Sequence, residues 1–515
     1  MKTFGCHCEE LKRRSNPMGL LCSPWSLAMT VLFVLFSQTL SAEPLHITIL
    51  HFNDIHGHVE PNCTAKKCEG GAARIATVIK NVKAENDARG TKTLVLFGGD
   101  AFSGTPVSSE FKGEAEFKVL DALGILAMVL GNHEFDFSLP VLKERIDEAK
   151  FHVLAANVRY KRSKKLLAEP GLTAMFSPTG ACTYIIGLVT PSTPHMTNPK
   201  NVAGLVFDDP VKTAKYYLKQ SEALEKQVPV LQIGLTHMGI EADVNLVEKT
   251  KGFDVIVGGH DHVRPNQYCR SVESVPVCQT PANGKYLGRL DLEMDGRKIK
   301  YLGSKLIELT PGIKEDPEIA SLVANFSKVI NAKYDKPIGV AKTNFSRGQG
   351  HENPMGDLVT DAMRSVANTD IAIINTSGIR STIKKGPVTL RMIAEVLPFE
   401  DYVMTTTLTG QEIEETLNSS IRKGGGAFLQ VSGLSFKMKG KKAVDISVGG
   451  EALSLDKSYS VATAEFLANG GEGYKVFKSK KSESTGMLLR EAFSQYLKGK
   501  KTIAASPLNR ILADN

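Results

Sequence analysis

The first half of the chain alternates short apolar runs with longer amphipathic segments. Segments with apolar residues at helical spacing, such as GAARIATVIKNVKAE and VKTAKYYLKQSEALEKQ, separate several of the short runs. Strands that alternate with helices predict an α/β domain with a largely parallel or mixed sheet. The apolar runs, between residue 45 and about residue 310, are LHITILHF, TKTLVLFGGD, LAMVLGNHEF, FHVLAANV, TYIIGLVT, VPVLQIGLTH and FDVIVGGHDH.

The pattern changes near residue 313. Residues 314–336, KEDPEIASLVANFSKVINAKYDK, predict one amphipathic helix that bridges to a second domain. After it, strand-like and helix-like runs mix with many turns, as in DIAIINTSGIR and YVMTTTLTGQEIEETLNSSI, which indicates an α+β domain. We therefore expect a first domain over 43–312, a linker helix within 313–338 and a second domain over 339–515.

The N-terminus has the layout of a secretory signal peptide. An apolar stretch over about residues 20–40 follows the basic residues 12–14 and ends in small residues. We expect residues 1–42 to be removed by cleavage after Ala42, which predicts a secreted or periplasmic protein. The stretch borders on membrane-spanning length, so an uncleaved anchor is the alternative, and Met18 is an alternative start. No second apolar run of spanning length follows, so we expect no membrane span in the mature chain.

Composition and charge describe an ordinary globular protein. Of its residues, 42% are hydrophobic and 23% are charged. A chain of 515 residues is too long for one ordinary core and suits two domains. The net charge of +8 is mild, and no basic stripe is interleaved with aromatic residues. A nucleic-acid polymer is therefore not an expected partner.

The cysteines after the predicted cleavage point also favour export. Cys63–Cys68 and Cys269–Cys278 are short-range pairs in polar, turn-rich segments, so we predict two loop-closing disulfides. A cysteine-ligated zinc site is the alternative, but neither pair has close C-x-x-C spacing. Cys182, in GACTYIIGLV, is predicted to be a buried free thiol.

Polar clusters follow several of the apolar runs. Each cluster alone could be a polar turn, but residues just past the carboxyl ends of parallel strands converge on one crevice. The repetition of Asp, His and Asn at so many strand ends therefore favours one shared site. The clusters are HFNDIHGH, FGGDAFSG, LGNHEFDF, GLTHMG and VGGHDH.

This residue set suits a particular chemistry. Histidine and carboxylate ligands with one bridging Asp can hold two divalent ions about 3.5–4 Å apart, an arrangement that binds and hydrolyses phosphate esters. A bridging carboxylate is needed because two close doubly charged cations repel each other. Glycines before Asp100, Asn132 and His260 allow a close approach of the backbone.

In combination these motifs resemble those of a known enzyme superfamily, the calcineurin-like metallophosphoesterases. They are D-x-H, G-D, G-N-H-E, a later His and G-H-x-H, in that order. The fuller strings HFNDIHGH and GNHEFD, together with the second half of the chain, resemble the secreted 5'-nucleotidase and UDP-sugar hydrolase family. The resemblance covers nearly the whole mature chain. It implies a four-layer α/β/β/α metallophosphoesterase domain, a bridging helix and a C-terminal α+β substrate-binding domain.

Carried over position by position, the resemblance implies two metal sites that share Asp100. It also implies a catalytic pair, His133 and Asp136. In this pair His133 stabilises phosphoryl charge or protonates the leaving oxygen, and Asp136 orients the His133 imidazole. His51 is interpreted as a local hydrogen-bonding residue and His58 as a loop side chain. One site would use Asp54, His56, Asp100 and His262, and the other Asp100, Asn132, His237 and His260.

The metal identity stays open at this point. Histidine-rich ligation with one Asn fits zinc, manganese or cobalt, and the resemblance favours zinc or manganese. Some family members have an amide where this chain has His262, so this position is a departure that could alter the relative affinity of the two sites.

The resemblance extends to a substrate pocket in the second domain. Two phenylalanines resemble rings that sandwich a nucleobase, two arginines resemble groups that contact phosphate or ribose, and an asparagine resembles one that bonds the nucleoside. Glu472 stands where many members have Asp, and an extra residue in HENPMG shifts the spacing from Arg347. These positions are Arg347, Asn375, Arg380, Phe399, Phe466 and Glu472.

We therefore expect an exported two-metal phosphohydrolase that acts on nucleotides, most of all on 5'-nucleoside monophosphates such as AMP. A nucleoside di- or triphosphate hydrolase, a UDP-sugar hydrolase and a 2',3'-cyclic phosphodiesterase with 3'-nucleotidase activity would use the same ligands. From other classes, a non-catalytic nucleotide-binding surface protein and a purely structural metal site are alternatives. The complete ligand set and the His133–Asp136 pair argue against both.

Overall fold

Two six-stranded mixed sheets form the centre of the N-terminal domain. The computed structural model describes residues 43–513 except 64–67, 177–179, 349 and 425–427, so the predicted signal sequence lies outside the described residues. The first sheet has the order β16-β15-β1-β4-β5-β6, and the second has the order β13-β14-β12-β11-β9-β8. Their bounds are β1 Leu45–Phe52, β4 Lys92–Phe97, β5 Ala127–Val129, β6 His152–Leu154, β8 Gly171–Phe176, β9 Ala181–Val189, β11 Val230–His237, β12 Val255–Gly258, β13 Cys269–Val272, β14 Val275–Gln279, β15 Tyr286–Asp295 and β16 Lys298–Glu308.

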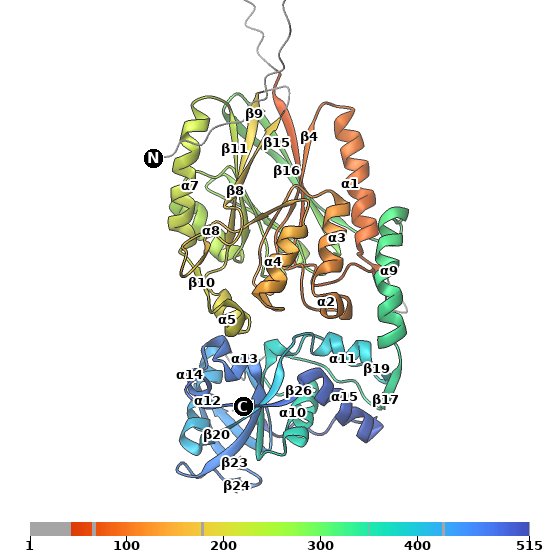
Figure 1. The fold of residues 1–515 in the computed structure, drawn as a ribbon, viewed down its shortest axis with the longest axis vertical. Helices are drawn as coiled ribbons and strands as arrows, with labels where there is room; N and C mark the ends of the chain where they lie inside the picture. The colour runs from red at the N-terminus through yellow and green to blue at the C-terminus, as the bar shows by residue number, and fades with distance from the viewer. Residues whose placement is uncertain (1–42, 64–67, 177–179, 349, 425–427, 514–515) are drawn as a thin grey trace, which may run out of the picture. The chain divides into compact units, whose positions relative to one another are not determined.

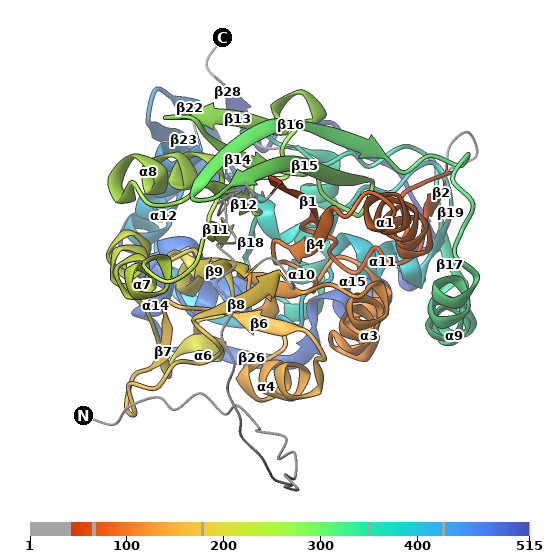
Figure 2. The same cartoon turned by 90° about the horizontal axis from the view of Figure 1, so that it is seen from above.

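The predicted four-layer α/β/β/α fold is confirmed. β1, β4, β5 and β6 run parallel, as do β9, β11, β12 and β14, while β8, β13, β15 and β16 pair antiparallel with their neighbours. Apolar side chains of both sheets, such as Ile49 and Ile233, belong to one buried cluster, so the sheets pack face to face. Figure 2 shows the helices on the two outer sides. They are α1 (Ala72–Asp87) and α3 (Glu114–Leu123) beside the first sheet, and α7 (Pro210–Glu225) and α8 (Ile240–Thr250) beside the second.

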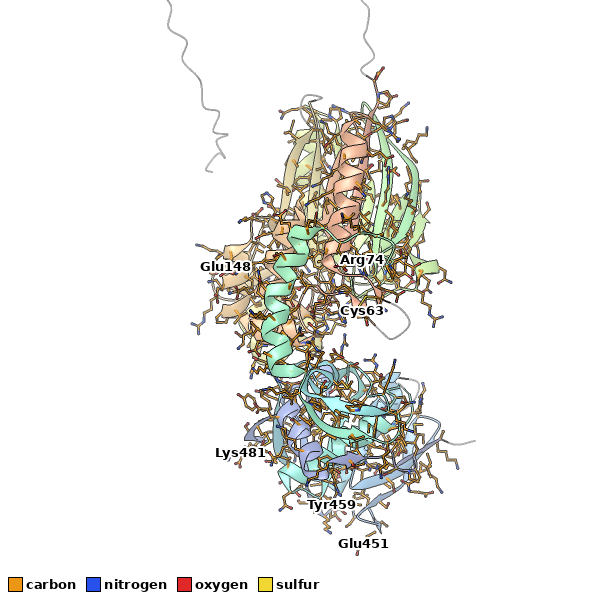
Figure 3. All side chains as sticks on the ribbon, turned by 90° about the vertical axis from the view of Figure 1, so that its right-hand side faces the viewer. Cys63, Arg74, Glu148, Glu451, Tyr459 and Lys481 are labelled. Atoms are coloured by element: carbon orange, nitrogen blue, oxygen red, sulfur yellow. A yellow bond between two sulfur atoms is a disulfide. The ribbon has the colours of Figure 1, made fainter. Side chains whose placement is uncertain are left out.

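The predicted bridging helix is α9, Pro317–Tyr334 (Figure 1). It begins three residues later than the apolar pattern suggested because the Asp316 side chain caps it, accepting the N–H of Ile319 at 3.2 Å. Two ion pairs fix the start of this helix to α1. Arg74 contacts Glu315 at 3.0 Å and Lys80 contacts Asp316 at 2.6 Å, and Figure 3 labels Arg74 on α1.

A five-stranded sheet with the order β21-β18-β25-β20-β26 organises the C-terminal domain. Along β18 the side chains alternate between two buried clusters, with Ala372 and Ile374 in one and Ile371 and Ile373 in the other. Both faces of this sheet are therefore covered, as the predicted α+β pattern requires. Its main elements are β18 Ile371–Asn375, β20 Tyr402–Thr409, β21 Leu429–Ser432, β25 Ser458–Ala464, β26 Glu483–Leu488, α10 Pro354–Ala367, α12 Gly410–Gly424 and α15 Leu489–Lys500.

The cysteine predictions are also confirmed. Cys63 is bonded to Cys68 and Cys269 to Cys278, and Cys182 is a buried free thiol. Across the described residues, no helix is long and apolar enough to cross a membrane. From Pro44 onward the chain forms one compact unit.

The start of α3 offers a test of this packing. Gly113 has a φ of 82°, and a Cβ added there would lie 2.0 Å from a ring carbon of the buried Phe102. Gly90 has a similar φ of 69° but nothing within 4 Å of its added Cβ. Gly113→Ala should lower the melting temperature more than Gly90→Ala, because overpacking adds roughly 1–3 kcal/mol to the shared backbone strain. Circular dichroism on heating measures both, and equal shifts would contradict this packing.

Candidate active site

The polar clusters predicted at the strand ends meet in one place. Asp54 and His56 follow β1, Asp100 follows β4, and His237 is the last residue of β11. His260 and His262 follow β12. The parallel strands of both sheets point their carboxyl ends at the same crevice, so residues about two hundred positions apart become neighbours.

The first group of donor atoms consists of Asp54, His56 and His262, whose ligand atoms lie within 4.8 Å of one another. His56 Nδ1 lies 3.1 Å from the carbonyl oxygens of Phe102 and Ser103. Since a carbonyl only accepts, Nδ1 carries the proton and Nε2 is left with its lone pair. This Nε2 lies 2.9 Å from His262 Nε2 and 3.7 Å from Asp54 Oδ1.

The second group consists of Asp100, His237 and His260, again within 4.8 Å. His237 Nδ1 donates to the Gly98 carbonyl at 2.6 Å, which leaves Nε2 at 3.0 Å from Asp100 Oδ2. His56 Nε2 is 3.9 Å from the same Asp100 oxygen, so Asp100 lies between the two groups. Asn132 Oδ1 is buried and has no hydrogen-bond partner among the described residues.

These donor sets fit two divalent cations. Two imidazole lone pairs and several carboxylate oxygens converge, an arrangement that is repulsive unless positive charge lies among them. The histidines whose Nδ1 atoms bond backbone carbonyls are held in the tautomer that presents Nε2 to a metal, which is the usual support of a histidine ligand.

The backbone at the site is strained. Asp54, His56, Asp100, His260 and His262 all have positive φ, between 47° and 102°. A non-glycine residue in this region costs of order 1–3 kcal/mol and is kept only when the surrounding structure requires it. Gly131 shows how close the loops come, because an added Cβ there would lie 2.1 Å from Asp100 Oδ1.

A buried carboxylate that the sequence reasoning left without a role joins these loops. Glu134 Oε2 accepts the N–H groups of Asp100 at 3.0 Å and Gly131 at 2.6 Å, and Oε1 accepts that of Ala101 at 2.6 Å. It therefore fixes the loop that carries the shared Asp100 to the loop that carries Asn132. Its place in GNHE, directly after two site residues, was the available signal.

Asn53 plays a similar part for Asp54. Its Nδ2 donates to Asp54 Oδ2 at 2.6 Å and to the Thr280 carbonyl at 2.9 Å, while its Oδ1 accepts from the Thr280 N–H.

The nearby residue His51, expected to be a local hydrogen-bonding residue, lies 3.0 Å from the Tyr268 hydroxyl. His58, expected to be a loop side chain, bonds the Ile55 carbonyl.

His133 and Asp136 lie beside the donor groups. His133 Nδ1 is 2.7 Å from Asp136 Oδ2, and the His133 backbone N–H donates to Asp100 Oδ1 at 2.8 Å. Burial lowers the pKa of His133, but the charges of Asp136 and Asp100 outweigh burial and raise it above its ordinary value. A positively charged imidazole next to a phosphate-binding centre can stabilise negative charge or give up a proton.

The family model for calcineurin-like phosphoesterases matches residues 47–264, and that for the 5'-nucleotidase C-terminal domain matches residues 336–479. A 5'-nucleotidase of Vibrio cholerae is 30% identical over 89% of this chain and 91% of its own length. The chain belongs to the 5'-nucleotidase family.

Two other known proteins are similar to nearly the whole chain. Protein UshA of Escherichia coli is 29% identical over 93% of this chain and 96% of its own length. The crystal structure of a 5'-nucleotidase precursor from Thermus thermophilus, 30% identical, superimposes with a TM-score of 0.80 and covers 92% of this chain and 100% of its own. As a member of the 5'-nucleotidase family, the protein is a metal-dependent phosphoric ester hydrolase that acts on nucleotides.

The predicted substrate residues of this family member line one cavity of about 1770 Å³ together with His56, Asp100 and His133. They are Arg347, Asn375, Arg380, Phe399, Phe466 and Glu472. The Phe399 ring stacks on the His133 imidazole, with ring centres 5.7 Å apart and planes 11° apart. The Arg380 guanidinium lies over the Phe399 ring at 5.9 Å.

The polar members of this set are held by neighbours. Asn375 Nδ2 donates to Glu472 Oε1 at 2.9 Å and to Ser377 at 2.6 Å. Arg347 donates to the carbonyl oxygens of Ile379 and Arg380 at 2.9 and 2.7 Å. All six residues therefore line the cavity, and the Arg347 guanidinium is hydrogen-bonded to backbone carbonyl oxygens.

The role of Glu134 can be tested by Glu134→Gln. The amide nitrogen cannot accept the backbone N–H groups that the carboxylate accepts, so Mn²⁺ affinity should fall about 10- to 100-fold, as is typical when a group supporting a ligand is lost. Titration calorimetry of the chelator-treated protein measures this affinity. Glu148→Gln, on a half-exposed carboxylate at the end of α4 (Leu139–Glu148), is the matched control and should leave affinity unchanged. Equal affinities for the two variants would contradict the assignment.

Proposed function

We propose that this hydrolase prefers 5'-nucleoside monophosphates such as AMP and releases nucleoside and phosphate. The observation that supports the proposal best is the cavity in which the histidine–carboxylate groups face two phenylalanines, two arginines and the Asn375–Glu472 pair. A phosphate bound at the histidine–carboxylate groups would place the attached nucleoside among the phenylalanines, the arginines and the Asn375–Glu472 pair. The relatives named as 5'-nucleotidases support the same preference.

In this proposal, Asp54, His56, Asp100 and His262 hold one divalent ion, and Asp100, Asn132, His237 and His260 hold the other. Two such ions, when bound, supply positive charge that polarises the phosphate and lowers the pKa of coordinated water. The predominance of imidazole donors with carboxylate and amide oxygens favours zinc or manganese.

His133 is proposed to act on the phosphoryl group during hydrolysis. Because Nδ1 is bonded to Asp136, Nε2 is the nitrogen available to the substrate. From there it donates a hydrogen bond to phosphoryl oxygen or a proton to the departing 5'-oxygen of the nucleoside. Asp136 keeps the ring oriented and favours its charged form.

Binding of the nucleoside falls to the second domain. Phe399 and Phe466 stack on the base, Arg347 and Arg380 contact phosphate or ribose oxygens, and Asn375 and Glu472 hydrogen-bond the nucleoside. The residues of this domain span 339–515, the metal-binding domain 43–312, and the linker with α9 lies within 313–338.

We further propose that the protein is exported and that residues 1–42 are removed. The support is the charged, then apolar, then small-residue pattern of that segment, together with two disulfides, which persist in oxidising compartments.

The direct test is phosphate release from AMP, ADP, ATP, UDP-glucose and 2',3'-cyclic AMP by the purified chain with zinc or manganese. AMP should give the highest kcat/KM, and His133→Ala should lower kcat about 10²- to 10⁴-fold, because general acid–base groups contribute that much. His152→Ala, on a partly exposed histidine, serves as the control and should match the wild type. Preference for another substrate would contradict the AMP proposal, and full activity of His133→Ala would contradict the role of His133.

The base pocket predicts a second result. Phe466→Leu should lower kcat/KM for AMP by roughly 1–3 kcal/mol of transition-state binding, because a stacked ring is lost, and should barely change kcat/KM for ribose 5-phosphate, which has no base. Steady-state kinetics with the two substrates measure the ratio. An equal loss for both substrates would argue against stacking by Phe466.

A further inference from the structure

Asp136 is held by more than its histidine. Its Oδ2 accepts from His133 Nδ1 at 2.7 Å and from the Ser103 hydroxyl at 2.6 Å. Its Oδ1 accepts from the Thr197 hydroxyl at 2.9 Å. Ser103 and Thr197 are both buried, and Thr197 lies sixty-one positions along the chain from Asp136.

The segment around Thr197 is itself attached to Asp136. It consists of the short helices α5 (Thr193–Met196) and α6 (Pro199–Val202) with Thr197 and Asn198 between them. Asn201 Nδ2 donates to the carbonyl oxygens of Phe135 at 2.8 Å and Asp136 at 2.9 Å. The segment around Thr197 therefore hydrogen-bonds both the side chain and the backbone carbonyl of Asp136.

The same segment contacts the second domain. Asn469 Nδ2 donates to Asn198 Oδ1 at 3.0 Å, and Lys200 pairs with Glu465 at 2.6 Å. Thr197 thus lies between the His133–Asp136 pair and these contacts.

The geometry points to Thr197 as a positioning residue: we propose that its hydroxyl fixes the rotation of the Asp136 carboxylate and thereby the ring of His133. This rests on the proposed function, because Thr197 acts through His133. The terminal torsion of an aspartate is soft, so a carboxylate held at one oxygen can turn. Ser103 shares Oδ2 with His133, whereas Thr197 holds the opposite oxygen. Catalytic groups lose rate steeply when their orientation is loosened.

The experiment compares Thr197→Val, which keeps the shape and removes the hydroxyl, with Thr197→Ser, which keeps the hydroxyl. kcat and KM for AMP are measured on the full chain with metal present. Thr197→Val should lower kcat about tenfold, the equivalent of one hydrogen bond to a charged group, with KM changed less than about twofold. Thr197→Ser, which keeps the hydroxyl, should have a kcat within about twofold of the wild type. Thr197→Ala removes the same hydroxyl if the Val variant does not fold.

A double-mutant cycle with Asp136→Ala separates positioning from a general structural role. In the Asp136→Ala background Thr197→Val should cause no further loss of kcat, because the group that it orients is gone. Equal kcat losses for the Val and Ser variants, or the same tenfold loss without Asp136, would overturn the inference. His133→Ala in the same assay distinguishes the two failures: if it keeps full activity, the proposed function is wrong, and if it loses activity while Thr197→Val does not, only this inference is wrong.

Discussion

The structure depends on the burial of carboxylates among imidazoles at the ends of the strands. Burial alone would raise the pKa of Asp100, but the positive charge of His237 and His133, when these rings are protonated, outweighs burial and holds this pKa well below its usual range. An isolated buried carboxylate would cost far more than a domain of this size gains from folding. Nearby donors and bound cations are what make this cluster tolerable, and the tight loops around it follow from that requirement.

Strained backbone, supporting side chains and domain packing all serve the same cluster. Asp54, His56 and Asp100 keep positive φ values while their side chains lie buried among the grouped donor atoms. Glu134 and Asn53 join neighbouring loops so that these angles are held. The two-sheet core beneath them is rigid and apolar, which keeps the strand ends at fixed separations.

Much of this could be predicted from the sequence because it depends on local patterns. β1, β4, β11 and β12 are short apolar runs, and the residues after them are chemically conspicuous. The start of α9 at Pro317 rather than near residue 314 did have a sequence signal, because an Asp followed by a Pro is typical of an N-cap and a first helical position. The contact of Thr197 with Asp136 had no sequence signal, since it depends on how two distant loops pack. The stacking of Phe399 on His133 was equally invisible, because the motif around Phe399 indicated contact with a base and gave no sign of an additional contact with this histidine.

In the proposed mechanism, Asp100 is shared by two metal ions that hydrolysis requires. The most direct measurement is the metal content of the purified protein and of Asp100→Asn by inductively coupled plasma mass spectrometry, with AMP hydrolysis measured on the same samples. The wild type should contain two ions per chain and show full turnover, and the variant should lose bound metal together with turnover. Two ions and unchanged turnover in Asp100→Asn would contradict it.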